Sequence, residues 1–174
     1  MRAVVLRTHG GPEVLTVEEL PEPHAGPGEV RVRVAAVAVN HLDVWVRKGL
    51  PHLQLEYPFR LGADVAGTVD EIGPGGRGVA AGDEIVVNPG QSCGRCRECL
   101  SGRDNLCRHY RLMGENMSGG YCEQIVVPAQ NVVPKPKSLP FAEAAALPTT
   151  FLTAWQMLTR KAPVHPGDDV RSEE

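Results

Sequence analysis

Four of the chain's five cysteines lie within one short stretch, residues 92–107, which reads SCGRCRECLSGRDNLC. Their spacing is Cys-x2-Cys-x2-Cys-x7-Cys, formed by Cys93, Cys96, Cys99 and Cys107. Four thiolates this close in sequence can converge on one tetrahedral zinc ion at about 2.3 Å, and the glycines between them permit tight turns. Four protein ligands leave no position for water or substrate, so the spacing predicts a structural Zn²⁺ rather than a catalytic one.

Two alternatives to zinc remain open for this cluster. An iron–sulfur run also begins Cys-x2-Cys-x2-Cys, but its fourth cysteine comes after three residues and precedes proline, whereas Cys107 comes after seven and precedes Arg108. Metal-free thiols are the second alternative.

The net charge of about −2 on a tetrathiolate zinc site would be partly offset by Arg95, Arg97, Arg103 and Arg108. The fifth cysteine, Cys122, enters an apolar segment, so we expect it to be a small buried hydrophobic side chain.

Composition limits the classes of protein to which the chain can belong. It has 174 residues, 42% of them hydrophobic, and a net charge of −3. No apolar run approaches the roughly 18 residues of a membrane span, and the N-terminus becomes polar too early for a signal peptide, so we expect a cytoplasmic protein without a membrane segment. Clustered thiols in that reducing compartment are more often metal ligands or catalytic groups than disulfides. The sequence has no basic stripe, which argues against nucleic-acid binding.

Short apolar runs bounded by Gly, Pro, Asn or Asp predict a β-rich domain. The clearest run has Val30, Val32 and Val34 alternating with arginines, which is the period of a half-buried strand. The other strands are expected within residues 2–6, 14–20, 65–73, 83–90 and 123–136, and PGGRG at 74–78 is expected to be a turn. Beyond these strands, Ala- and Leu-rich sequence predicts one helix over 141–147 and a longer helix after Pro148.

The order of these motifs resembles the N-terminal GroES-like domain of the medium-chain dehydrogenase/reductase superfamily, particularly its quinone oxidoreductase branch. The segments that carry the resemblance are residues 1–49, FRLGADVAGTVDEIGPG at 59–75, the four-cysteine stretch, GGYCEQIVVP at 119–128 and AALPTTFLTAW at 145–155. The resemblance implies a mainly β fold with short helices, in which a partly open GroES-like β-barrel is followed by the truncated start of a Rossmann domain. The expected bounds are 1–136 for the catalytic domain, with the zinc lobe at 92–108, and 137–174 for linker helices and the start of the cofactor domain.

The same resemblance implies an oxidoreductase that uses NADP(H) or NAD(H) on a small-molecule carbonyl or quinone substrate, and it suggests a homodimer. Zinc alcohol dehydrogenases of this superfamily hold a catalytic zinc at positions matched here by Asn40, by Ala63 followed by Asp64, and by Thr149 with Thr150. These residues do not supply the nitrogen and sulfur ligands that a catalytic zinc needs. The chain is therefore similar to the zinc-free reductases at this site, while it keeps the structural zinc lobe.

The resemblance places Asn40 and Thr150 beside the nicotinamide or the substrate and Trp45 in the wall of the pocket. Asn40 could polarise a substrate oxygen or hold a carboxamide, or it could simply end a strand at a turn. Asp43 and Asp64 could be pocket acids, although Asp43 could instead cap the helix that follows it. His41 could contact the pyrophosphate of the cofactor, or it could be a surface histidine. We assign no role to the other histidines.

A Rossmann cofactor domain is marked by Gly-x-Gly-x-x-Gly between a strand and a helix, and none occurs after residue 140. We therefore expect this chain to have no dehydrogenase activity alone, because the turn that anchors a pyrophosphate is missing. Three functions stay open: the catalytic portion of a quinone, enone or carbonyl reductase, a zinc-dependent alcohol dehydrogenase with replacement ligands such as His41 or Asp64, and a stand-alone zinc-stabilised module without catalysis.

Overall fold

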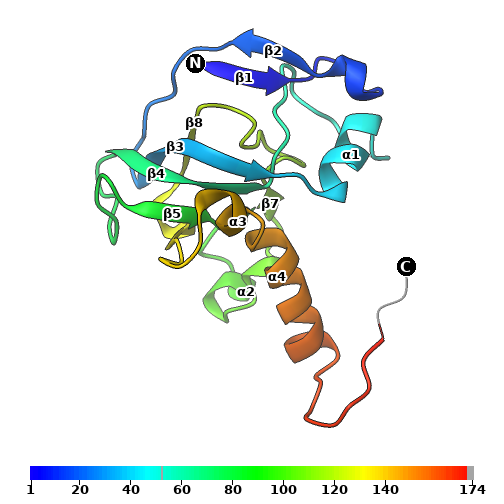
Figure 1. Cartoon of the computed structure of the whole chain (residues 1–174). Helices are drawn as coiled ribbons and strands as arrows, with labels where there is room; N and C mark the ends of the chain where they lie inside the picture. The colour runs from blue at the N-terminus through cyan, green and yellow to red at the C-terminus, as the bar shows by residue number, and fades with distance from the viewer. Residues whose placement is uncertain (52, 172–174) are drawn as a thin grey trace.

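A five-stranded antiparallel sheet forms the centre of the fold, with the strand order β8-β3-β4-β5-β9 (Figure 1). The computed structural model describes residues 1–51 and 53–171. The strands of this sheet are β3 (Glu29–Ala38), β4 (Asp64–Ile72), β5 (Glu84–Val87), β8 (Gln124–Pro128) and β9 (Val132–Pro134).

Strands β8 and β9 follow each other in the chain but lie at opposite edges of this sheet. Only a 3₁₀ turn, Ala129–Asn131, separates them. A connection this short spans at most about 14 Å, so the sheet must curl until its two edges approach each other. This curling confirms the expected mainly β fold with a partly open barrel. The single strand expected over 123–136 is wrong, because buried Asn131 turns the chain at that point.

Two small sheets flank the barrel. Strands β1 (Arg2–Val5) and β2 (Thr16–Glu19) pair with each other, and the Val4 N–H ties β1 to the barrel by donating to the Tyr121 carbonyl at 2.8 Å. The strand expected over 14–20 begins only at Thr16, since Pro12–Val14 form a 3₁₀ turn. Strands β6 (Gly90–Gln91) and β7 (Arg111–Leu112) pair on either side of the four-cysteine stretch.

The alternation in β3 is confirmed by its burial. Val30 and Val32 are fully buried in the barrel core. Between them Arg31 faces outward and forms ion pairs of 2.9 Å with both Asp70 and Glu71 on β4. The buried members of this core cluster are Val30, Val32, Val65, Val69, Ile85, Val87, Met113, Ile125, Val127 and Ala129. The alternation of valine and arginine therefore fixes which face of β3 points into the barrel.

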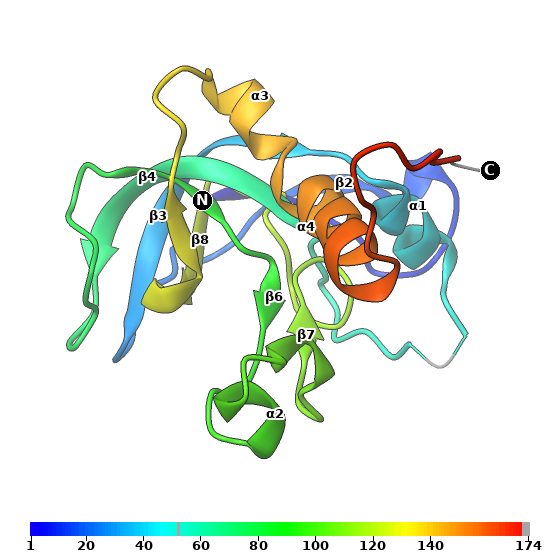
Figure 2. The same cartoon turned by 90° about the horizontal axis from the view of Figure 1, so that it is seen from below.

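Within residues 1–51 and 53–171, four α-helices accompany the barrel: α1 (His41–Lys48), α2 (Arg97–Leu100), α3 (Phe141–Ala145) and α4 (Pro148–Gln156), with a π-helical turn at Met157–Lys161. Helix α3 packs Ala144 and Ala145 against Ala66 of β4. Helix α4 projects away from the barrel, and residues 151–171 are all exposed (Figures 1 and 2). The two helices expected after residue 140 are confirmed. No helix in the described part of the chain is long and apolar enough to cross a bilayer.

Candidate functional site

The four-cysteine stretch forms a lobe that projects from the barrel and carries α2 (Figure 2). The Sγ atoms of its four cysteines all lie within 4.8 Å of one another. The Cys96 and Cys99 sulfurs are 3.4 Å apart, and those of Cys93 and Cys99 are 3.9 Å apart. Four sulfurs around a tetrahedral zinc would be about 3.8 Å apart. All five cysteines are free thiols, so the four in the lobe are placed to hold one metal ion.

Local backbone geometry brings these sulfurs together. Gly94 and Gly102 adopt φ values of 69° and 72°, a left-handed conformation that other residues rarely take. Cys96 immediately precedes α2 and Cys99 lies within it, so this one-turn helix sets their separation. The glycine turns predicted from the sequence are therefore the ones that aim the ligands.

Backbone N–H groups point at the sulfurs of Cys107 and Cys93. The N–H groups of Cys93 and His109 donate to the Cys107 Sγ atom at 3.4 and 3.3 Å. Hydrogen bonds from the backbone N–H groups of Arg95 and Cys96 lower the pKa of the Cys93 thiol to about 6. The thiolate is the form that binds metal ions, so this shift favours metal binding at Cys93. At Cys96 a backbone N–H lowers the pKa, but hydrogen bonds with the neighbouring thiols and burial outweigh it and raise the pKa to about 11.

Buried amide contacts hold the base of the lobe to the barrel. The Asn131 Nδ2 atom donates to the carbonyl oxygens of Asn88 at 2.9 Å and Gly90 at 2.6 Å. Gly90 lies directly against the Tyr110 hydroxyl, so a side chain at this position would require the Tyr110 ring to move. The lobe therefore leaves the barrel at one fixed point, although its interior depends on the cysteines.

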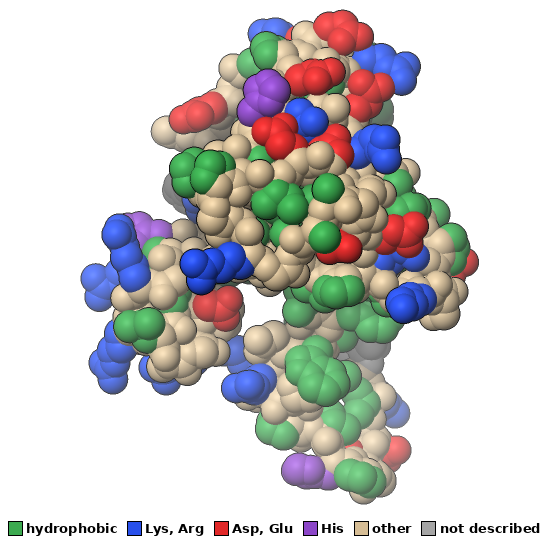
Figure 3. Space-filling model, turned by 90° about the vertical axis from the view of Figure 1, so that its left-hand side faces the viewer, with side chains coloured by type: hydrophobic (Ala, Val, Ile, Leu, Met, Phe, Trp, Pro, Cys, Tyr) green, Lys and Arg blue, Asp and Glu red, His purple; other side chains and the backbone are tan. Residues whose placement is uncertain are grey.

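Positive charge gathers on the surface of the lobe, at the lower left of Figure 3. The exposed arginines are Arg95, Arg97, Arg103 and Arg108. Arg103 pairs with Glu98 at 2.9 Å.

The fifth cysteine, Cys122, lies outside the four-sulfur group and packs beside the barrel core. Burial raises the pKa of its thiol, but Cys122 is only partly buried rather than the buried side chain expected from the sequence.

A second cluster of polar side chains lies where α1 begins. Asn40 and Asp43 form a capping box, in which the Asn40 side chain faces the Asp43 backbone N–H. In return the Asp43 Oδ2 atom accepts from the Asn40 backbone N–H at 2.8 Å, and its Oδ1 atom accepts from the Gly62 N–H at 2.8 Å. Asp43 therefore takes part in helix capping, but from the third position of a helix that begins at His41 and not from in front of the helix, where the sequence predicts it; Asn40 is the N-cap residue.

Asp64 is the most enclosed acid of this cluster, with no exposed surface. Its Oδ2 atom accepts from Asn40 Nδ2 at 3.0 Å. Its Oδ1 atom accepts from the Thr149 backbone N–H at 2.9 Å and from the Thr149 hydroxyl at 2.6 Å. The carboxylate thus joins the first residues of α1 to the first residues of α4.

Burial shifts the acid–base properties of the residues beside this cluster. Burial raises the pKa of the Asp43 carboxyl, and the charge of Asp64 adds to the effect, although backbone N–H groups oppose it. Burial and the nearby Asp43 raise the pKa of the Tyr121 hydroxyl well above its ordinary value. A buried carboxyl and a half-buried phenol therefore lie together at the start of α1.

Of the four residues expected near a cofactor, Asn40 is half-buried, and the other three, His41, Trp45 and Thr150, are exposed. The rings of His41 and Trp45 lie 6.0 Å apart on neighbouring turns of α1. Trp45 is 54% exposed. The Thr150 hydroxyl donates to the Ala146 carbonyl at 2.7 Å on the surface of α4.

The structure thus brings Asn40, Asp43 and Asp64 together, and it adds Thr149, for which no hydrogen-bonding role was predicted. The contact was missed because 85 positions separate Thr149 from Asp64. Within the part of the chain that the structure describes, the four cysteines form the one group of three or more metal-binding side chains.

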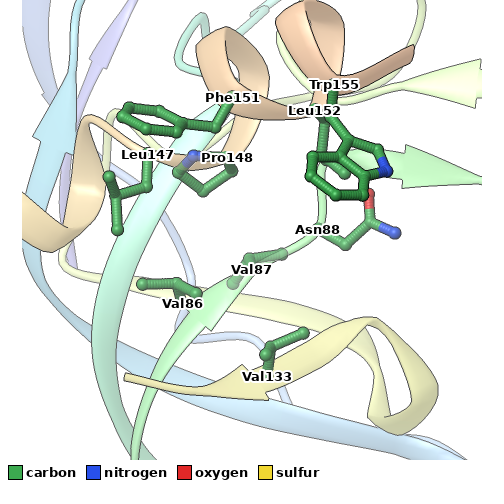
Figure 4. A pocket seen from close by; sticks show the side chains of 9 residues that line it. All are labelled: Val86, Val87, Asn88, Val133, Leu147, Pro148, Phe151, Leu152 and Trp155. Carbon is green, nitrogen blue, oxygen red and sulfur yellow. The ribbon is translucent and has the colours of Figure 1, made fainter. Parts of the chain in front are cut away.

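An apolar groove of about 380 Å³ runs between α4 and the barrel (Figure 4). Figure 4 shows Val86, Val87 and Val133 on its barrel side. Side chains of α4 face them, including Phe151 and Trp155, which are 65% and 67% exposed. The face of α4 that lines the groove is therefore apolar.

Comparisons with known proteins agree with this architecture. The family model described as alcohol dehydrogenase GroES-like domain matches residues 26–137. A protein named NAD-dependent alcohol dehydrogenase from Saccharolobus solfataricus is 34% identical over 95% of this chain and 49% of its own length. A protein named L-threonine 3-dehydrogenase from Pyrococcus horikoshii is 36% identical over 70% of this chain and 36% of its own length.

Solved structures show the same likeness. A crystal structure described as an NAD-dependent alcohol dehydrogenase is 60% identical and superposes with a TM-score of 0.94 over 97% of this chain and 49% of its own. A cobalt- and zinc-bound thermostable alcohol dehydrogenase from Pyrobaculum aerophilum is 41% identical, with a TM-score of 0.87 over 96% of this chain and 50% of its own. The chain spans about half the length of the curated relatives that it matches across most of its own length.

Proposed function

Because this chain belongs to the alcohol dehydrogenase GroES-like domain family, we propose that it is the substrate-binding half of an NAD(P)-dependent oxidoreductase. The reaction moves a hydride between a nicotinamide cofactor and a small carbonyl compound. The names of the relatives, NAD-dependent alcohol dehydrogenase and L-threonine 3-dehydrogenase, support this reaction class. The chain's own residues would bind and orient the substrate, while the nicotinamide supplies the hydride.

The proposed direction is reduction of a quinone, an enone or a related carbonyl without a catalytic metal. The observation that carries this proposal is the hydrogen-bonded cluster of Asn40, Asp64 and Thr149, at positions where the resemblance to zinc alcohol dehydrogenases implies a catalytic zinc. An amide, a buried carboxylate and a hydroxyl supply hydrogen bonds, but they do not supply the nitrogen and sulfur donors that a catalytic zinc prefers. Asn40 would then donate to the substrate oxygen, where negative charge develops during hydride addition.

Three exposed residues would contact the cofactor in this proposal. Trp45 would line the pocket, Thr150 would contact the nicotinamide, and His41 would contact the pyrophosphate. Their exposure leaves them free to touch a ligand. Both NAD(H) and NADP(H) remain candidates, since the solved relatives include one complexed with NADH and one bound to NADP.

The four-cysteine lobe would hold Zn²⁺ with a structural role. The sulfur separations fit a tetrahedral ion, and four protein ligands would leave no position for a substrate. The ion would order the lobe and take no part in hydride transfer.

A metal-dependent alcohol dehydrogenase is the second candidate function. The cobalt- and zinc-bound relative favours it. It would require replacement ligands such as His41 or Asp64, and the three hydrogen bonds already held by the Asp64 oxygens weigh against it.

A kinetic comparison of the full-length gene product separates the two candidates. NADH and NADPH oxidation is followed with quinones, enones and aldehydes, and NAD⁺ reduction is followed with alcohols. The proposal expects turnover of a quinone or conjugated carbonyl, and a fall of about 100-fold in kcat for Asn40→Leu, which removes the donor. Turnover confined to alcohols, with Asn40→Leu unaltered, would contradict it.

A further inference from the structure

The Asp64 carboxylate occupies the junction of three elements. It is the first residue of β4, and its register partner, Ala38, ends β3 just before Asn40. Its three hydrogen bonds reach Asn40 at the start of α1 and Thr149 at the start of α4. One buried side chain therefore sets how far apart these two helix ends lie.

Asp64 acts as a long-range cap for α4. The first N–H groups of a helix have no partner within it, and Leu147, which precedes α4, provides no side-chain cap. The Asp64 Oδ1 atom accepts one of these N–H groups, that of Thr149, at 2.9 Å. A negative charge is also favoured at a helix N-terminus, so Asp64 stabilises α4 in its position against the barrel.

The same carboxylate fixes which way the Asn40 amide is turned. An ionised carboxylate only accepts hydrogen bonds, so Asn40 must point its Nδ2 atom at Asp64. Its oxygen then faces the Asp43 backbone N–H in the capping box. One Nδ2 hydrogen remains, and no residue that the structure describes accepts it. Since Asn40 is half-buried rather than enclosed, this hydrogen is available to a ligand.

We propose that Asp64 is a positioning residue, which holds the Asn40 amide so that its remaining N–H donates to the oxygen of a carbonyl ligand. The same bonds keep Thr150, one residue beyond Thr149, at a fixed distance from that donor. Asp64 has no exposed surface and both of its oxygens are occupied. It therefore acts through Asn40 instead of serving as a pocket acid. This proposal rests on the proposed reductase function.

Exchanging the side chains at positions 40 and 64 distinguishes a positioning role of Asp64 from a purely stabilising role. In Asp64→Asn the new amide must turn a donor toward either Asn40 or Thr149, so one pairing is lost. The swapped variant, Asp64→Asn with Asn40→Asp, restores all three pairings because the carboxylate now accepts from residue 64. However, the carboxylate at position 40 has no N–H for a substrate. Asp70→Asn is the matched control, since Asp70 lies on the same strand and pairs with Arg31 away from this site.

The test measures urea unfolding midpoints, kcat and KM of the full-length gene product. We expect Asp64→Asn to lower both the midpoint and kcat, the latter about tenfold or more. The swapped variant should recover the midpoint while kcat stays about 100-fold low, with a smaller change in KM. The control should keep the kcat of the unaltered enzyme.

Three results would overturn the proposal: a swapped variant with unaltered kcat, a swapped variant that does not fold, or Asp64→Asn with unaltered midpoint and kcat. If Asp64→Asn itself does not fold, the swapped variant decides. Absence of turnover in the unaltered enzyme would contradict the proposed function instead, and the midpoints of the single and swapped variants would still test the pairing of residues 40 and 64.

Discussion

Replacing one lobe cysteine should unfold the lobe and leave the barrel intact. Cys99→Ser is the sharpest change, because the Cys99 sulfur lies 3.4 and 3.9 Å from those of Cys96 and Cys93. Serine keeps the size of the side chain but is a poor zinc ligand at neutral pH. Cys122→Ser is the matched control, since Cys122 lies outside the four-sulfur group.

The lobe has little else to hold its shape. Among residues 92–108 only Cys107 is buried, and two leucines are turned outward, Leu100 at 76% and Leu106 at 51% exposure. A structural zinc contributes on the order of 10 kcal/mol to folding, whereas the lobe buries almost no apolar surface to replace it. The barrel core is formed by other strands, so we expect its unfolding free energy to change by only about 1–2 kcal/mol.

Limited trypsin digestion with metal analysis tests this prediction. Lobe arginines such as Arg95 and Arg103 are trypsin sites on the surface. Cys99→Ser should bind less than about a tenth of the zinc at micromolar metal and should be cleaved within 92–108 at least about tenfold faster, in proportion to the opened population. The control should hold one zinc per chain and resist cleavage. Equimolar zinc and unaltered cleavage in Cys99→Ser would contradict the prediction.

Three further predictions concern the barrel, the buried acid and α4. Asn131→Ala should lower the unfolding free energy by about 2–3 kcal/mol, because the carbonyls of Asn88 and Gly90 lose their donor. Urea unfolding measures this loss, with Gln130→Ala, a change at an exposed neighbour, as the control. A loss below roughly 0.5 kcal/mol, the range of neutral surface substitutions, would contradict the prediction. Burial raises the Asp43 pKa in the folded state, so the unfolding free energy should fall as pH rises from the ordinary Asp pKa of 3.8 through the folded pKa of Asp43. In Asp43→Asn the unfolding free energy should fall less over this pH range. An equally steep fall in the variant would contradict the pKa shift. The groove beside α4 should bind an apolar dye, and Trp155→Gln, which changes a groove residue, should weaken that binding several-fold. Val17→Thr, a change at an exposed residue outside the groove, is the control. Equal dye fluorescence in the two variants would show that the dye binds elsewhere.

Local patterns made the lobe and much of the barrel predictable from the sequence. The four cysteines lie within 15 positions, 93–107, so their spacing alone limits which atoms can share an ion. The valines of β3 repeat every second residue, which assigns one face to the core. The Asp43 cap likewise involves residues three positions apart.

Contacts between distant segments could not be predicted in this way. The link from Asp64 to Thr149 joins the start of a strand to the start of a helix, and nothing in either segment indicates the other. The split of 123–136 into two strands depends on Asn131, whose partners lie 41 and 43 positions away. Both features come from tertiary packing, which local propensity does not determine.

We propose that hydride transfer from the nicotinamide to a substrate held at Asn40 needs no catalytic metal. The most direct test measures metal content and kcat on the same sample of the full-length gene product, before and after dialysis against a chelator. We expect one tightly held zinc per chain, placed in the lobe, and an unaltered kcat for a quinone or conjugated carbonyl. A second metal ion per chain, whose removal abolishes turnover while the lobe zinc remains, would contradict the claim.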